Sequence, residues 1–353
     1  MVIRENIPLA PLTTFKVGGP ARYFADCAGE SEVKRAVSYA AEHKLPLFVL
    51  GGGSNLVIAD EGWPGLVLRI SIQGLEETAN GFFRVGAGED WDEFVGHAVG
   101  EKYAGIECLS GIPGTVGGTP VQNVGAYGQE IADTIVYVRV LEIATGKIVE
   151  LNKSECGFAY RRSIFNSTER DRYIVLRVMY HLEQDGEPLL EYADVKNYFA
   201  ASPKRPTLQQ VRDAVREIRR SKAMLIVEGD EDCCSAGSFF KNPILSPTDA
   251  GQIESLAQQK APGRNLPRYP VENGMVKLPA AWLVEQAGFY KGYARGPVAI
   301  SRKHSLAIVN RGGASASDIM ALKDEIQTRV LEVWGVHLQP EPVFVGFELP
   351  DSK

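Results

Sequence analysis

One stretch decides the fold: Leu47-Phe48-Val49-Leu50-Gly51-Gly52-Gly53-Ser54-Asn55-Leu56. Its four apolar residues predict a buried strand that runs directly into three glycines. A dinucleotide-binding fingerprint needs a further glycine at position 56 and a helix directly after it. Leu56 instead opens a β-prone run, so the Rossmann interpretation fails. What remains is a loop whose backbone N–H groups can closely approach a pyrophosphate, although a tight turn without a ligand explains a single loop equally well.

A second glycine-rich segment shifts the balance toward ligand binding. Residues 110–128 hold six glycines and two prolines. A loop this long and this rich in glycine is usually functional rather than a simple connection. Its hydrogen-bonding side chains are uncharged, which suits a ligand wrapped by backbone: Ser110, Thr115, Thr119, Gln122, Asn123 and Tyr127.

Composition limits the class of protein. With 353 residues, the chain is expected to form more than one core. It is 44% hydrophobic and 23% charged, as is usual for a soluble globular protein, and it shows neither a signal peptide nor an apolar run long enough for a bilayer. The net charge of −6 provides no overall field for nucleic acid or anionic membranes. We therefore expect a cytoplasmic protein that binds neither, in which an anionic substrate needs a local basic cluster.

The cysteines and histidines give no metal or disulfide signal. The five cysteines follow neither a disulfide framework nor a zinc spacing, and the five histidines are scattered singly. The pair Cys233-Cys234 follows the acidic run 228–232 and is interpreted as two loop thiols. We expect no metal site.

The order of the predicted elements separates three parts. The first has a helix over residues 33–41, capped by Ser31, and strands at 47–50 and 66–70. The second has a strand at 82–85, a helix at 91–99, a hairpin with strands 135–143 and 147–151 around Ala144-Thr145-Gly146, and a strand at 173–182. Residues 203–206 are interpreted as a linker.

The third part begins with a helix that Thr207 and Gln210 cap reciprocally. Further elements are a helix near 279–288, strands within 298–310, and a helix over 319–334 with Ser317 and Gly335 in cap positions.

Several motifs together resemble a known family. The first loop and Ser110-Gly111-Ile112-Pro113-Gly114-Thr115-Val116-Gly117-Gly118 resemble the two FAD loops of vanillyl-alcohol-oxidase-type flavoproteins. Tyr160-Arg161-Arg162-Ser163-Ile164-Phe165, Gly237-Ser238-Phe239-Phe240-Lys241-Asn242-Pro243 and Pro340-Glu341 are similar to motifs of the UDP-N-acetylenolpyruvoylglucosamine reductase family. The resemblance runs from about residue 6 to residue 347.

The resemblance implies an α+β fold with a two-part FAD-binding domain and a C-terminal α+β substrate-binding domain. The implied parts are FAD-binding subdomain 1 at 1–72, to which the tail 343–353 returns, subdomain 2 at 73–206, and the substrate-binding domain at 207–342. It also implies noncovalent FAD, NADPH as hydride donor, and reduction of UDP-N-acetylglucosamine enolpyruvate to UDP-N-acetylmuramate for peptidoglycan precursor synthesis. The implied partners are therefore this UDP-sugar enolpyruvyl ether and NADPH, and a monomer is expected.

The resemblance assigns roles to individual residues. It implies that Arg161 holds the substrate carboxylate, Ser238 gives a proton to C2, and Glu341 helps to stabilise the intermediate. The implied cofactor-binding residues are Gly51, Gly52, Gly53, Ser54, Asn55, Leu56, Ser110, Gly111, Pro113, Gly114, Thr115, Gly117, Gly118 and Gly125. The implied substrate-binding residues are Tyr127, Tyr160, Tyr192, Lys222, Asn242 and Gln286, with Lys222 near the diphosphate.

Elementary chemistry is compatible with these roles, but each residue also has a plain structural interpretation. A planar guanidinium can bind a carboxylate with two hydrogen bonds. Taken alone, however, Arg161 is interpreted as a surface arginine. A positioned hydroxyl can protonate an enolate. Taken alone, however, Ser238 is interpreted as part of a turn. Glu341 lies between two prolines, and its alternative is a solvent-facing loop residue. Lys222 ends a basic helix, which can simply be a solvated face that offsets the helix dipole.

One stretch departs from the family pattern. The family commonly has a short, proline-containing segment after this lysine, but here residues 223–227 are apolar and an acidic loop follows. The segment Leu190-Glu191-Tyr192 suggests the subtype with a mobile tyrosine loop.

Two other functions stay open from the residues alone. One is an oxidase or dehydrogenase that tethers its flavin through histidine or cysteine. The glycine loops contain neither residue, although Cys108 lies just before the second loop. The other is a flavin- or nucleotide-binding protein without catalytic activity.

Overall fold

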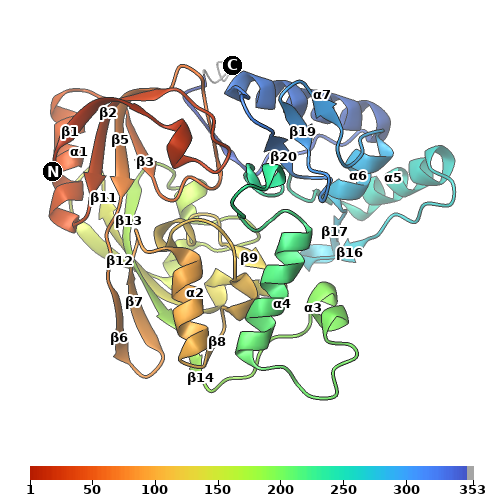
Figure 1. Cartoon of the computed structure of the whole chain (residues 1–353), viewed down its shortest axis with the longest axis horizontal. Helices are drawn as coiled ribbons and strands as arrows, with labels where there is room; N and C mark the ends of the chain where they lie inside the picture. The colour runs from red at the N-terminus through yellow and green to blue at the C-terminus, as the bar shows by residue number, and fades with distance from the viewer. Residues whose placement is uncertain (348–353) are drawn as a thin grey trace. The chain divides into compact units, whose positions relative to one another are not determined.

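The computed structural model describes residues 1–347 and divides into two compact units (Figure 1). The first unit comprises Met1–Pro8, Pro20–Gly53 and Trp63–Ile226. The second comprises Leu9–Gly19, Ser54–Gly62 and the described residues from Val227 on. Helices and strands are mixed in both units, as expected for the α+β class.

The first unit opens with a four-stranded sheet in the order β1-β2-β5-β3. Strands β2, β5 and β3 are parallel, and β1 is antiparallel to β2. Helix α1 connects β2 to β3 and buries Val33, Ala36, Val37 and Ala40. The bounds are β1 Ile3–Pro8, β2 Pro20–Cys27, α1 Glu30–Glu42, β3 Leu47–Leu50 and β5 Trp63–Ile70.

The predicted cap of α1 was wrong. The N-cap is Gly29, and Ser31 lies inside the helix. The carbonyl of Gly29 already accepts the N–H groups of Glu32 and Val33, and the Glu32 carboxylate accepts the N–H of Ala28 at 2.9 Å. An acidic side chain in the first turn therefore stabilises this helix start, as the helix dipole favours.

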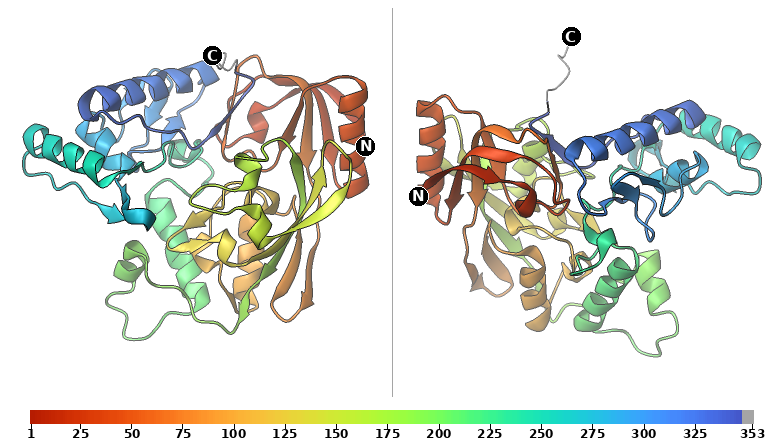
Figure 2. Two further views of the ribbon diagram at one scale, coloured as in Figure 1. Left: turned by 180° about the vertical axis from the view of Figure 1, so that it is seen from behind. Right: turned by 45° about the horizontal axis from the view of Figure 1, so that its top comes forward.

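A second sheet of five antiparallel strands follows in the order β12-β11-β13-β7-β6, coloured from orange to yellow-green in Figure 2. The predicted hairpin is confirmed, with Gly146 at a φ of +66° between β11 and β12. Helix α2 starts after Asp90, whose side chain accepts the N–H of Glu93. The bounds are β6 Leu75–Ala79, β7 Phe82–Gly86, α2 Trp91–Gly100, β11 Ile135–Glu142, β12 Ile148–Asn152 and β13 Tyr173–His181.

Short strands and two helices complete the first unit. Helix α4 has the reciprocal cap between Thr207 and Gln210 that the sequence predicts. Its residues group with the first unit, whereas the sequence analysis placed 207 onward in a substrate-binding domain. The three-part functional division stays a prediction. The bounds are β8 Tyr103–Ala104, β9 Gly125–Ala126, β10 Gln129–Glu130, β14 Glu183–Gln184, α3 Ala193–Tyr198 and α4 Leu208–Ser221.

The described part of the second unit packs three helices with two three-stranded sheets and one strand pair around a core that includes Phe239, Leu283, Ile319 and Trp334. The long blue helix in Figure 2 is α7. The bounds are β15 Ile244–Leu245, α5 Pro247–Lys260, β16 Tyr269–Pro270, β17 Val276–Lys277, α6 Ala280–Gln286, β18 Ala294–Arg295, β19 Val298–Ile300, β20 Ile308–Asn310 and α7 Ala316–Trp334. The 3-10 helices of the chain are η1 Ala10–Leu12, η2 Glu107–Leu109, η3 Val116–Gly118, η4 Ile131–Asp133, η5 Lys153–Cys156, η6 Ile164–Asn166, η7 Glu231–Cys233 and η8 Glu272–Gly274.

The end of the described chain pairs with a strand from near its beginning. Strand β21 (Val343–Val345) lies parallel to β4 (Leu56–Ile58), directly after the first glycine loop. The tail that was expected to return thus contacts residues within 1–72, and both strands belong to the second unit. Residues 348–353 of that prediction lie outside the described residues.

The N-terminus of α7 holds residue 60 to this unit. Its N-cap is Ser315, in a reciprocal cap with Asp318, so the predicted cap at Ser317 was wrong. Ser317 instead lies in the first turn, where its N–H and hydroxyl both donate to the carboxylate of Asp60. Asp60 also accepts the N–H of Ala316 at 2.7 Å. The predicted C-terminal cap, Gly335, is confirmed at a φ of +69°.

We predict that Asp60→Ala lowers the free energy of unfolding by about 1–2 kcal/mol, because an anion at a helix N-terminus and its hydrogen bonds are lost together. Urea unfolding followed by circular dichroism measures this change. Glu61→Ala is the matched control, since the neighbouring side chain is exposed. Equal stability of the two variants would contradict the assigned role of Asp60.

Candidate functional site

The two glycine loops touch each other inside the first unit. A Cβ on Gly52 would lie 2.6 Å from Cα of Gly114 and 3.0 Å from N of Thr115. A Cβ on Gly51 would lie 3.1 Å from the hydroxyl oxygen of Thr115. Such contacts are too short for a side chain, so only glycine at position 52 permits this backbone approach.

The second loop is fixed at its middle by backbone hydrogen bonds. The N–H of Trp91 donates to the carbonyl of Gly114, and the N–H of Val116 donates to the carbonyl of Glu89. Gly117 donates to the carbonyl of Ala87, and a Cβ on Gly117 would lie 2.6 Å from Cβ of Ala87. The loop therefore lies directly against the start of α2.

Several donors in these loops have no partner within the described residues 1–347. The amides of Gly52, Gly53, Ile112, Gly114 and Thr115 donate no hydrogen bond there. The buried hydroxyl oxygen of Thr115 likewise has no partner in that range. Converging amides and a buried hydroxyl without partners fit an anionic ligand such as the diphosphate of FAD. Residues 51–53 and 112–115 would hold it.

Two of the expected cofactor residues already have their polar groups bound within the protein. The N–H of Gly111 donates to the carboxylate of Asp92, and its carbonyl accepts from Arg219. The Ser110 side chain is fully buried and donates to the carbonyl of Glu107 at 2.6 Å. The positions of Ser110 and Gly111 thus indicate that they support the loop.

Arg161 lies against the far end of the second loop. It stands in a tight turn at a φ of +54°, and its Nη2 donates to the carbonyl of Gly125 at 2.7 Å. Its guanidinium lies over the ring of Tyr160, 5.4 Å from the centroid, and its side chain is half-buried. The role of Arg161 in substrate binding stays a prediction.

Tyr127, Tyr192 and Lys222 gather beside that loop. The rings of Tyr127 and Tyr192 meet edge to face, with centroids 5.4 Å apart. Lys222 is the C-cap of α4, and its Nζ lies 2.5 Å from the carboxylate of Asp194 in the first turn of α3. Burial raises the pKa of Tyr127 above its ordinary value.

Ser238 and Glu341 come from segments that pair in the second unit. The N–H of Glu341 donates to the carbonyl of Phe239 at 2.8 Å, and the N–H of Lys241 donates to the carbonyl of Gln339. The backbone thus brings these two candidate catalytic residues near each other. Asn55 from the first glycine loop donates to the carbonyl of Glu341 at 3.2 Å.

The other two expected substrate contacts also lie in the second unit, Asn242 beside the start of α6 and Gln286 at its end. Asn242 accepts the N–H of Ala280 at the start of this helix, so at least one of its groups has a structural partner. Gln286 is the last residue of the helix and is half-buried.

The acidic loop that departs from the family pattern binds a basic turn of the second unit. Lys303 forms an ion pair with Asp230 at 2.6 Å. The buried carboxylate of Asp232 accepts the N–H of Arg302 and the hydroxyl of Ser301. The carboxylates of this loop are therefore engaged in structural contacts within the second unit.

Two carboxylates that organise the second loop, one partly and one fully buried, were not among the predicted site residues. Asp92 binds Gly111 and two arginines of α4. Glu107 is fully buried and accepts from the amides of Gly105 and Leu189 and from the side chain of Gln129. The signal in the sequence was an acidic residue just before the glycine-rich loop or at the start of an apolar helix.

Cys108 is poorly suited to flavin attachment. It is fully buried, its thiol points to the carbonyl of Leu189 at 3.4 Å, and burial raises its pKa. Cys27 and Cys156 are buried as well, and burial raises the pKa of each thiol to about 12. A thiolate nucleophile is thus disfavoured at these three positions.

None of the helices within residues 1–347 is both long and apolar enough to cross a membrane. The same part of the chain has no group of three or more acidic, histidine or cysteine side chains placed to hold a metal ion.

Comparisons with known proteins agree with this geometry. Residues 21–152 match the FAD binding domain, and residues 230–345 match the UDP-N-acetylenolpyruvoylglucosamine reductase C-terminal domain. The UDP-N-acetylenolpyruvoylglucosamine reductase of Thermobifida fusca is 46% identical over 353 residues, covering 98% of each chain. That of Streptomyces avermitilis is 42% identical, covering 98% of this chain and 95% of the relative.

A solved structure shows the same fold along the whole chain. The crystal structure of the reductase from Thermus caldophilus aligns with a TM-score of 0.67 and 28% identity, covering 98% of this chain and 100% of that one. The expected fold class, with an FAD-binding domain and a C-terminal domain of the reductase type, is confirmed. FAD is the cofactor, and this chain belongs to the UDP-N-acetylenolpyruvoylglucosamine reductase family.

Proposed function

We propose that this oxidoreductase reduces UDP-N-acetylglucosamine enolpyruvate to UDP-N-acetylmuramate with NADPH, as a step of cytoplasmic peptidoglycan precursor synthesis that serves cell shape and division. The observation that carries the proposal is the pairing of the Ser238 segment with Pro340-Glu341. This pairing places a hydroxyl and a carboxylate on adjacent backbones, as proton delivery and stabilisation of a charged intermediate require. The names of the relatives support the substrate.

Bound FAD, which residues 51–53 and 112–115 would hold, would supply the hydride chemistry, with NADPH as the reductant. The residues of the chain supply the rest. Arg161 binds the carboxylate next to the developing charge, and a guanidinium suits this because it stays charged and donates in a planar fork. Ser238 gives a proton to C2, and Glu341 assists. Tyr127, Tyr160, Tyr192, Asn242 and Gln286 contact the substrate, and Lys222 contacts its diphosphate.

The alternatives within the fold predict other properties. An oxidase with a tethered flavin would need a reactive side chain beside the cofactor, whereas Cys108 is buried with a raised pKa. A flavin-binding protein without activity would not depend on Ser238. Noncovalent FAD in a monomeric enzyme remains our proposal.

We predict that Ser238→Ala blocks only one half of the reaction. NADPH-dependent flavin reduction should stay near the wild-type rate, while reoxidation by the enolpyruvyl substrate should slow by about 10²–10⁴-fold, as for a lost general acid. Stopped-flow absorbance of the flavin measures each half separately. Ser238→Cys should restore part of the second half, because a thiol also gives a proton.

Ser255→Ala on α5 is the control, since this exposed serine bonds only to the carbonyl of Gly251. If Ser238→Ala slows both halves of the reaction equally, the role of the serine is structural. If Ser238→Ala slows neither half of the reaction, the proton comes from another group, and Glu341 is the next candidate.

We further predict that Lys222→Ala weakens binding of UDP and of the substrate by about 10- to 150-fold, because a charged hydrogen bond contributes about 1.5–3 kcal/mol. The half-exposed pair with Asp194 costs little to break. Asp194→Ala should therefore leave UDP binding equal or tighter. Inhibition constants for UDP measure both variants. If neither variant changes UDP binding, Lys222 belongs to the solvated helix end.

A further inference from the structure

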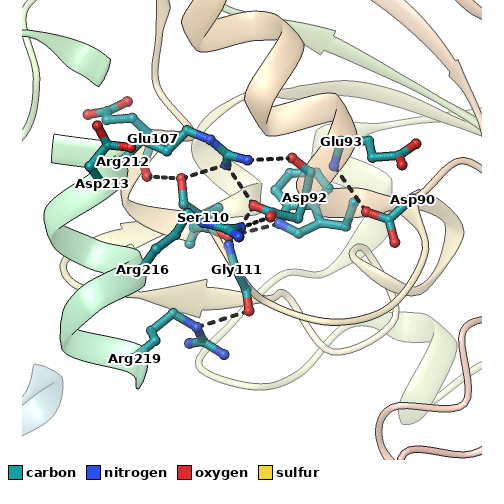
Figure 3. A network of polar contacts seen from close by, with 12 residues as sticks. Asp90, Asp92, Glu93, Glu107, Ser110, Gly111, Arg212, Asp213, Arg216 and Arg219 are labelled. Carbon is teal, nitrogen blue, oxygen red and sulfur yellow. Dashed lines mark hydrogen bonds and ion pairs between the residues drawn. The ribbon is translucent and has the colours of Figure 1, made fainter. Parts of the chain in front are cut away.

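The arginines on one face of α4 bind other groups of the protein. Arg212, Arg216 and Arg219 are spaced so that they share one side of the helix, and all three point toward the start of the second FAD loop (Figure 3). Their partners lie in the loop, in α2 and at Met224 after the helix. These side chains are therefore not a general basic surface for the diphosphate.

The carboxylate of Asp92 is the centre of this arrangement. It lies in the first turn of α2 and accepts the N–H of Gly111 at 2.6 Å. Nη1 of Arg212 donates to the same oxygen at 2.6 Å, and Arg216 forms an ion pair with the other oxygen. Arg212 also donates to the carbonyl of Asp92 and to the hydroxyl of Ser110, both at 3.1 Å.

Arg219 fixes the same loop residue from the other side. Its Nε donates to the carbonyl of Gly111 at 3.1 Å, and its Nη2 donates to the carbonyl of Met224 at 2.6 Å. Gly111 has a φ of +72°, and a Cβ there would lie 2.8 Å from the side chain of Leu225. The flanking peptide groups of Gly111 are thus held between α2 and α4, directly before the open amides of residues 112–115.

The charges explain why Asp92 matters more than any one arginine. The side chains of Asp92 and Arg212 are 23% and 13% exposed. Burial alone would raise the pKa of Asp92, but hydrogen bonds from Arg212 and Gly111 hold it below its usual value. Without this carboxylate, two partly buried guanidinium groups would face each other uncompensated. Without Arg216, the negative charge of Asp92 would still balance the positive charge of Arg212.

We propose that Asp92 is a positioning residue for FAD, whose carboxylate holds helix α4 and the start of the second FAD loop in the one arrangement that presents the open amides of residues 112–115 to the cofactor. The inference rests on FAD binding, and it is independent of the substrate proposed above. Its failure would leave the proposed reaction untouched.

The test is release of FAD from the holoenzyme on dilution, followed by flavin fluorescence. Asp92→Asn should weaken FAD binding by about 10- to 100-fold, since a charged hydrogen bond to the loop is lost. Arg216→Gln should have a smaller effect. The double variant Asp92→Asn/Arg216→Gln should lose less affinity than the sum of the two, because removing one arginine relieves the unpaired charge.

Arg220→Gln is the matched control on the same helix, because this exposed arginine pairs with Glu217 of α4 itself. Wild-type FAD release from Asp92→Asn would overturn the proposal, and so would strictly additive effects, which two independent sites predict. If Asp92→Asn does not fold, Arg212→Gln and Arg216→Gln decide the question, and wild-type release from both would overturn it.

Discussion

The backbone contact between Gly52 and Gly114 is the constraint on which the cofactor site depends. Two loops that are far apart in sequence approach so closely that a single methyl group at position 52 would overlap main-chain atoms. Because the loops meet through backbone, their unbonded amides converge on one region together with the hydroxyl of Thr115. An anionic cofactor can then be bound mainly by main-chain groups, without a dedicated basic side chain.

The surrounding helices keep the second loop in place. Its middle bonds to the residues before and at the start of α2, and its beginning is held by Asp92 and Arg219. The buried Glu107 connects the same region to Leu189, in the segment that leads to Tyr192. The basic residues of α4 therefore organise the cofactor loop, and Lys222 at the helix end remains the candidate for the substrate diphosphate.

Local features of the fold could be predicted from the sequence. The strand at 47–50, the hairpin at Gly146, the cap of α4 and the C-terminal cap of α7 each depend on neighbouring residues, and each is as predicted. The glycine loops and the family motifs also identified the cofactor. Helix starts were less predictable, because Gly29 and Ser315 cap their helices where Ser31 and Ser317 were also suitable.

Features that depend on distant residues could not be predicted. Within the second unit, Asp60 joins residues 54–62 to the start of α7, which lies more than 250 positions later in the chain. Asp92 binds arginines of α4 that are 120 and 124 positions away. Neither carboxylate belongs to a motif, and a single sequence shows no spacing that would pair them.

The most direct test of this account is the affinity of FAD for the Gly52→Ala variant. The added methyl group must push the two loops apart, so we expect FAD affinity to fall by more than about 100-fold, with Gly100→Ala, where a Cβ meets no atom within 4 Å, unchanged. The dissociation constant, measured by flavin fluorescence on dilution of the holoenzyme, decides the point. Wild-type affinity in Gly52→Ala would contradict the claim that contact between the loops forms the FAD site.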